Sequence, residues 1–207
     1  MSSLVLVGRS SSHFTRIARI VGLELGVPFA FEPVYDITSL SERTFADNPT
    51  LRVPSLRTDR GTFFGSLNVS RELARRAGAE GTIVWPEDLV EVTSANAQEI
   101  VLDTMAAEVT IVTARLAEVP REHPFFAKQF ARVDASVAWL ERELLDVIAR
   151  LPDRSLSFLE VSAFCLCTHL PFREIRSIAE CPKLVEFSSA FAARPSARAT
   201  EYRFDKP

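Results

Sequence analysis

The sequence is short of cysteine and histidine, and each shortage excludes a class of protein. Three cysteines in 207 residues are an odd number, which fits neither a disulfide-stapled secreted domain nor a zinc site of paired Cys-x-x-Cys motifs. Cys165 and Cys167, one residue apart, are expected to be core residues of a helix. The three histidines are scattered along the chain, so no metal site is expected.

Long apolar runs and an excess of either charge are also missing. No apolar stretch approaches the roughly 20 residues that span a bilayer, and residues 1–8 lack the pattern of a signal peptide. The formal net charge of −3 indicates neither nucleic acid nor an anionic membrane as a partner. We therefore expect a cytoplasmic protein with a real core, since 47% of its residues are hydrophobic.

Hydrophobic periodicity divides the chain into an α/β part at residues 1–77, a linker at 78–86 and an all-helical part at 87–207. The first part alternates short apolar runs with helical patterns, which gives the order βαβ and then ββα. The expected strands lie at 4–7, 29–34, 55–58 and 62–64, and the expected helices begin at His13 and Ser66.

The second part shows only helical patterns. Ser157 and Glu160 have the spacing of a capping box, in which a serine oxygen and a glutamate each bind one free backbone N–H at a helix start. The expected helices are 87–119, 124–151, one from Ser157, 173–179 and 182–193.

The segment from Asn48 to Leu56 contains a Val53-Pro54 step at the entrance to an apolar strand. Proline cannot donate to a strand ladder, so this position indicates either an edge strand or a cis peptide bond. A cis bond costs only about 0.5–1 kcal/mol before proline. We expect the backbone N–H and C=O of Val53 to point outward, free to pair with an extended peptide.

These motifs, taken in order, resemble the cytosolic glutathione transferases. Ser12 to Ile20 is similar to that family's Ser-Pro-Tyr-x-x-x-x-Arg-Ile stretch, with His13, expected to be exposed, in place of proline. Asn48 to Leu56 resembles its Asn-Pro-x-x-x-Val-Pro-x-Leu segment, and Ser66 its glutathione-binding serine. The resemblance implies a thioredoxin-like domain with a mixed four-stranded sheet, followed by an all-α domain.

The family chemistry assigns a role to a serine at the start of the first helix. Only a thiolate attacks, and a free thiol with a pKa near 8.5 is mostly protonated at neutral pH. A serine O–H and the positive end of a helix dipole both stabilise that anion. Alignment on Arg19 assigns this role to Ser12, with Ser11 and Ser10 as alternatives; simple helix capping is the competing interpretation.

The resemblance also implies a glutathione site formed by Arg52, Val53, Pro54, Gly65 and Ser66. The backbone of Val53 would pair with the cysteinyl unit, and Ser66 would bind the γ-glutamyl carboxylate at a helix N-terminus. Gly65 stands where the family usually has an acidic or amide side chain, and Leu51-Arg52 replaces Gly-Lys. These departures weaken the site, and Ser66 has plain capping as its alternative role.

Two classes of function follow. The first is a glutathione transferase that joins the thiolate to a small apolar electrophile, without a metal and as a homodimer. Its pocket would be lined by Phe14, Met105 and Val109, although a core role for these three is the alternative. A glutathione-dependent isomerase is a variant, because Ser10 to Ser12 faintly resembles the Ser-Ser-Cys start of the zeta class. The second class is a transferase-like binding or assembly module without turnover, which Gly65 and Leu51 favour.

Overall fold

The computed structural model describes residues 4–120 and 122–206, and it divides into two units. The first unit comprises Met1–Ile83 and Ala193–Pro207, and the second comprises Val84–Ala192. The residues from Ala193 onward thus group with the sheet-containing unit, whereas the hydrophobic periodicity places them in the helical part. The domain boundaries at residues 77 and 87 stay predictions.

A mixed four-stranded sheet with the order β2-β1-β3-β4 lies at the centre of the first unit. β1 pairs with β2 in parallel, while the β1–β3 and β3–β4 pairs are antiparallel. This arrangement confirms the thioredoxin-like βαβ-ββα fold class. The strands are β1 (Val5–Gly8), β2 (Ala30–Pro33), β3 (Ser55–Thr58) and β4 (Gly61–Phe64).

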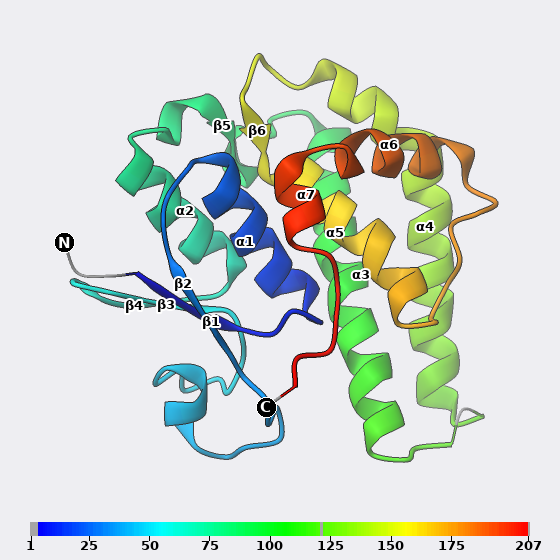
Figure 1. The fold of residues 1–207 in the computed structure, drawn as a ribbon. Coiled ribbons are helices and arrows are strands. Elements are labelled where there is room, and N and C mark those ends of the chain that lie inside the picture. Colours follow the sequence, from blue (N-terminus) through cyan, green and yellow to red (C-terminus); the bar gives the residue numbers. More distant parts are fainter. Residues whose placement is uncertain (1–3, 121, 207) are drawn as a thin grey trace. The chain divides into compact units, whose positions relative to one another are not determined.

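Successive side chains of β1 enter two different cores, because neighbouring residues of a strand point to opposite faces. Leu6 packs with residues of helices α1 (His13–Glu24) and α2 (Ser66–Ala77), which lie together on one face of the sheet (Figure 1). Val7 packs on the other face against the segment that includes the 3-10 helix η1 (Glu42–Phe45). Both faces of the sheet are therefore apolar and covered.

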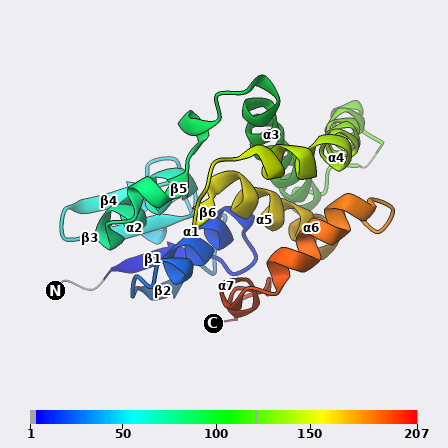
Figure 2. The ribbon, with the colours of Figure 1, turned by 90° about the horizontal axis from the view of Figure 1, so that it is seen from above.

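The second unit is helical. Helices α3 (Val92–Leu116) and α4 (Pro124–Arg150) form an antiparallel pair (Figures 1 and 2), and the residues between them include Arg121, which lies outside the described residues. Nearly every residue of α5 (Phe158–Phe172) is buried, as expected for a central helix. The remaining elements are η2 (Glu80–Thr82), β5 (Ile83–Val84), η3 (Pro86–Asp88), β6 (Leu156–Ser157), α6 (Pro182–Ala192) and, in the first unit, α7 (Pro195–Ala199).

None of the helices described is both long enough and apolar enough to cross a bilayer.

The expected helix at 173–179 was wrong. Pro171 lies in the last turn of α5, and Glu174 takes a left-handed conformation with φ 52°. The N–H of Ile175 then turns back to the carbonyl of Leu170 at 3.0 Å, which closes the helix end. Residues 173–181 consequently form turns and irregular backbone rather than a helix.

The first long helix is shorter than the expected 87–119, because Glu118 is left-handed with φ 55° and Glu91 serves as an extended N-cap. The capping box at Ser157 is only half formed. Its hydroxyl accepts a hydrogen bond from the Glu160 N–H at 3.5 Å. The Glu160 carboxylate instead receives two bonds from Arg154, at 2.7 and 2.9 Å.

Candidate glutathione site

Strand register brings three of the predicted segments to one end of the sheet. Val7 lies opposite Ser55, and Ser55 lies opposite Phe64. Because both pairs are antiparallel, the turn after β1, the segment before β3 and the start of α2 meet at this end. A hydrogen bond of 3.0 Å from the Gly65 N–H to the Pro54 carbonyl joins two of them directly. The N-termini of α1 and α2 both follow strands that end here.

The Val53-Pro54 bond is cis, which is one of the two alternatives that the sequence left open. Among the residues that the structure describes, neither the N–H nor the C=O of Val53 has a hydrogen-bond partner. The segment before it is ordered by Asn48, which is buried and donates from Nδ2 to the Arg52 carbonyl at 2.9 Å. Asn48 Oδ1 accepts from both the N–H and the hydroxyl of Thr50. The unpaired N–H and C=O of Val53 thus form a free backbone edge, and the hydrogen bonds of Asn48 hold the loop that carries it.

Of the three candidate serines, Ser12 differs from the others in exposure. Ser10 and Ser11 are 1% and 2% exposed, whereas Ser12 is half-buried. Ser12 is the N-cap of α1, and its Oγ accepts from the Thr15 N–H at 3.3 Å. The capping role is therefore present, and it leaves the hydroxyl hydrogen of Ser12 without an acceptor among the described residues.

Ser66 is not the N-cap of α2, so it does not have the capping role that was its alternative. Gly65 occupies the N-cap position with φ 82° and ψ 151°, and Ser66 is the first helical residue. Ser66 is 8% exposed, and its hydroxyl has no hydrogen-bond partner in the described part of the chain. The free N–H groups of a helix N-terminus and this hydroxyl together suit an anion such as a carboxylate.

The two residues before Val53 also depart from the pattern of the family. Leu51 is left-handed, with φ 53°, a conformation that glycine adopts more easily. Its side chain packs on the apolar core that Val7 and Phe45 share. Arg52 is exposed, and its guanidinium has no hydrogen-bond or ion-pair partner among the described residues.

Two buried arginines of α1 were not recognised as contributors from the sequence. Arg16 donates to the Ala197 carbonyl at 3.1 Å, and Arg19 donates to the Ala199 carbonyl at 3.3 Å. Arg19 also reaches the Ser10 hydroxyl at 3.5 Å. Desolvation by burial lowers the pKa of Arg19, and the positive charges of Arg203 and Arg16 add to this effect while Asp205 opposes it. Only the fold reveals the contacts with Ala197 and Ala199, because they join residues about 180 positions apart.

The residues predicted to line an electrophile pocket belong to different units. Phe14 lies in α1 of the first unit and is half-buried, whereas Met105 and Val109 lie in α3 of the second. Met105 is fully buried, which fits its alternative role in the core. His13 is 1% exposed, and its ring meets Phe14 edge-on at 4.5 Å, so the expectation of an exposed imidazole was wrong.

The cysteines give no support to thiol chemistry by the protein itself. All three are buried and free, and Cys165 and Cys167 lie in α5, as expected. Burial raises the pKa of Cys167 to about 12, which keeps it a protonated thiol at neutral pH.

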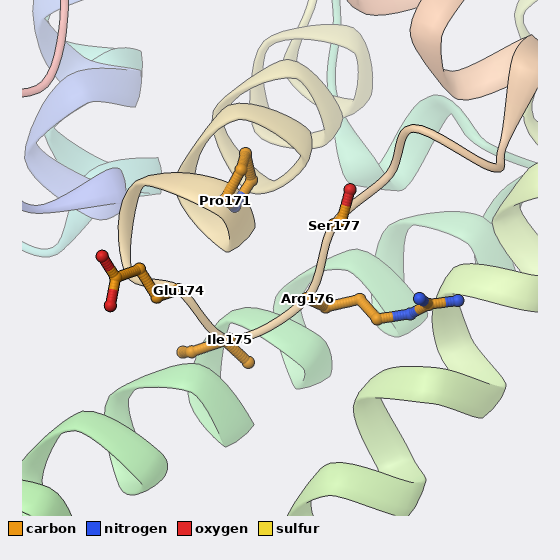
Figure 3. A pocket seen from close by; sticks show the side chains of 5 residues that line it. All are labelled: Pro171, Glu174, Ile175, Arg176 and Ser177. Atoms are coloured by element: carbon orange, nitrogen blue, oxygen red, sulfur yellow. The ribbon is translucent and has the colours of Figure 1, made fainter.

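A hollow of about 310 Å³ lies beside the end of α5 in the second unit (Figure 3). Its two charged side chains, Glu174 and Arg176, extend in opposite directions, and Arg176 pairs with Asp134 at 3.1 Å. The lining therefore offers no convergent polar groups of the kind that orient a bound molecule.

Comparison with known proteins agrees with this geometry. The family model "Glutathione S-transferase, N-terminal domain" matches residues 6–81. No curated protein is significantly similar in sequence to this chain.

Several solved structures have the same fold at low identity. A glutathione S-transferase of Methylobacterium radiotolerans, in complex with glutathione sulfonate, is 20% identical with a TM-score of 0.74, over 100% of this chain and 98% of its own. A family member from Pseudomonas fluorescens with bound glutathione is 20% identical with a TM-score of 0.76, over 97% and 100%. The Tau class enzyme of mango is 17% identical with a TM-score of 0.74, over 98% and 94%.

The resemblance drawn from the motifs is thus confirmed for the first part of the chain: residues 6–81 match the glutathione S-transferase N-terminal domain, and the whole chain has the fold of solved glutathione transferases.

Proposed function

We propose that this protein is a glutathione transferase that joins the glutathione thiolate to a small apolar electrophile. The observation that carries the proposal is the meeting, at one end of the sheet, of an unpaired backbone edge and two helix N-termini. The relatives from Methylobacterium and Pseudomonas bind glutathione sulfonate and glutathione, which supports the same class of ligand here.

In this proposal the tripeptide lies against the Val53 backbone as an added strand. The γ-glutamyl carboxylate binds at Ser66 and the N-terminus of α2, where backbone N–H groups favour an anion. The thiol lies beside Ser12, whose hydroxyl donates to the sulfur. That hydrogen bond and the α1 dipole lower the thiol pKa, so that the thiolate attacks an electrophilic carbon and the leaving group departs with its electron pair.

Two alanine variants with matched helix caps test the role of Ser12. Ser12→Ala and Ser157→Ala each remove a hydroxyl that accepts from the N–H three residues on, so each loses about 1 kcal/mol of stability. We expect Ser12→Ala to lower kcat about a hundredfold with a chlorodinitrobenzene as the electrophile, while Ser157→Ala keeps wild-type turnover. Equal turnover of the two variants would refute the role of Ser12.

A second candidate is a binding module without turnover, which Gly65 favours because it supplies no side chain to the γ-glutamyl ammonium. A transferase is retained on immobilised glutathione, gains thermal stability with millimolar glutathione and consumes the electrophile. A module that has lost the site does none of these, and that outcome would overturn the proposed transferase. A glutathione-dependent isomerase would bind glutathione but leave the electrophile unconsumed.

Assembly and location are also proposals, and they rest on the resemblance to the glutathione transferases. We propose a cytoplasmic homodimer whose partners are glutathione and a small molecule, and neither nucleic acid nor a membrane. A monomer in light scattering at micromolar concentration would contradict the dimer.

A further inference from the structure

The C-terminal segment at residues 193–206 runs along α1 within the first unit (Figure 1). At one end, Arg194 and Ser196 both bond the carboxylate of Glu24, the last residue of α1, with the arginine at 2.6 Å. Further along, carbonyls at the end of α7 accept from Arg16 and Arg19. These charge-assisted contacts fix the segment against the helix that Ser12 begins.

The far end of the segment reaches the turn that carries Ser12. That turn closes through a bond of 3.1 Å from the Ser12 N–H to the Arg9 carbonyl. Inside it, the Ser10 N–H donates to Asp205 Oδ2 at 2.7 Å, across 195 positions of sequence, and Arg19 holds the Ser10 hydroxyl. The side chain of Asp205 is 9% exposed. The turn is therefore bonded from outside by a residue at the end of the chain.

We propose that Asp205 is a positioning residue, which holds the turn at residues 9–12 so that the Ser12 hydroxyl points at the glutathione sulfur. This inference rests on the proposed transferase function. A single lost hydrogen bond to a carboxylate loosens the turn, and a displacement of about 1 Å at a reacting group can lower a rate up to a hundredfold.

The charge of Asp205 acts in the opposite direction from its hydrogen bond. A carboxylate near the start of α1 disfavours a second anion, the thiolate, at the same helix end. Arg203 lies 3.9 Å from Asp205 and the positive charge of Arg19 acts on the same carboxylate, so much of this repulsion is offset. The acceptor atom, and not the charge, is thus the useful feature of this side chain.

The test compares three variants of the full-length protein. Asp205→Ala removes the acceptor, and Asp205→Asn keeps an oxygen acceptor without the charge. Glu201→Ala removes an exposed acid from the same segment and is the matched control. The measurements are kcat and KM for glutathione with a chlorodinitrobenzene, the pH profile of kcat, and amide hydrogen exchange of residues 9–12.

We expect Asp205→Ala to lower kcat about tenfold, to change KM for glutathione less than threefold, and to shift the pH profile to higher pH. Exchange of the Ser10 and Ser12 amides should accelerate about tenfold. Asp205→Asn should restore kcat to within about threefold and keep the amides protected. Glu201→Ala should match wild type in every measurement.

Two results would overturn the inference. One is wild-type kcat and pH profile in Asp205→Ala, with only its melting temperature lowered, which would make Asp205 a structural anchor alone. The other is an Asp205→Asn variant as impaired as Asp205→Ala, because the charge would then matter more than the acceptor. If the wild-type protein neither binds nor turns over glutathione, the transferase proposal fails independently of Asp205. The positioning role is then still tested by amide hydrogen exchange, and unchanged exchange of residues 9–12 in Asp205→Ala would overturn it.

Discussion

Replacing Gly65 by alanine is expected to destabilise the protein although it fills empty space. Gly65 has φ 82° and ψ 151°, in a region that only glycine adopts readily. A Cβ added there meets no heavy atom within 4 Å. The cost is therefore backbone strain alone, about 1–3 kcal/mol, reduced by up to about 1 kcal/mol because alanine also restricts the unfolded chain. A net loss of about 1–2 kcal/mol lowers the Tm by about 2–8 °C in a chain of this length.

Gly81→Ala is the matched control for this experiment. A Cβ at Gly81 also meets nothing within 4 Å, but its φ is not in the left-handed region. Urea unfolding of the two variants should give a loss for Gly65→Ala and no loss, or a small gain, for Gly81→Ala. Gly65→Ala at wild-type stability would refute the conclusion that this position requires glycine.

Gly65→Glu then separates strain from ligand binding. The glutamate variant carries the same backbone strain as the alanine variant, so the ratio of their glutathione affinities reports the carboxylate alone. A charge-assisted bond to the γ-glutamyl ammonium would raise the affinity about tenfold or more over Gly65→Ala in calorimetry. Equal affinities would mean that the ammonium of the bound peptide lies elsewhere.

Two further predictions concern stability away from the peptide edge. Hydrogen bonds from Arg75 and Arg76 lower the pKa of Glu72 from 4.5 to about 2, although desolvation acts in the opposite direction. The stability that the ionised carboxylate contributes is therefore complete above pH 4.5 and is lost as the pH falls toward 2. Glu72→Gln should therefore cost about 2 kcal/mol at pH 7 and little near pH 2 in urea unfolding, and a cost independent of pH would contradict this. Phe164 is 1% exposed and stacks on Phe191 at 4.5 Å, so Phe164→Ala should cost about 3–5 kcal/mol, whereas Val90→Ala, at a residue 88% exposed, should be near neutral.

Local pattern was enough to predict the four strands of the sheet and the helices α1 and α2. The strands of the sheet were found from short apolar runs, and the entrance at Val53-Pro54 from the inability of proline to donate. The same local reasoning was wrong at 173–179, because residues with helical propensity there follow a left-handed Glu174 that ends α5. Backbone handedness at a non-glycine residue leaves no mark in hydrophobic periodicity.

The contacts that hold the candidate site could not be found in this way. Asp205 carries no local signal, since its partner is a backbone N–H at Ser10. In the sequence, Arg16 and Arg19 lie in a helical pattern and resemble ordinary surface charges. In the structure both are buried, and each donates to a carbonyl of α7. A sequence pattern reports which residues avoid water, and it does not report which distant backbone group a buried charge will meet.

The alignment of the site segments therefore depends on polar contacts more than on the hydrophobic pattern. A one-residue slip of β1 would exchange Leu6 and Val7 between two apolar faces, so burial alone discriminates weakly against it. Polar contacts at the start of β3 and just after β4 discriminate better against a wrong register. The Ser55 hydroxyl donates to the Phe45 carbonyl at 2.9 Å, and the Gly65 N–H donates to the Pro54 carbonyl at 3.0 Å. A one-residue slip of β3 would break both bonds and leave the buried Ser55 hydroxyl without its acceptor, at about 1–3 kcal/mol. The same few contacts that set the register thus also place the Val53 edge beside the start of α2.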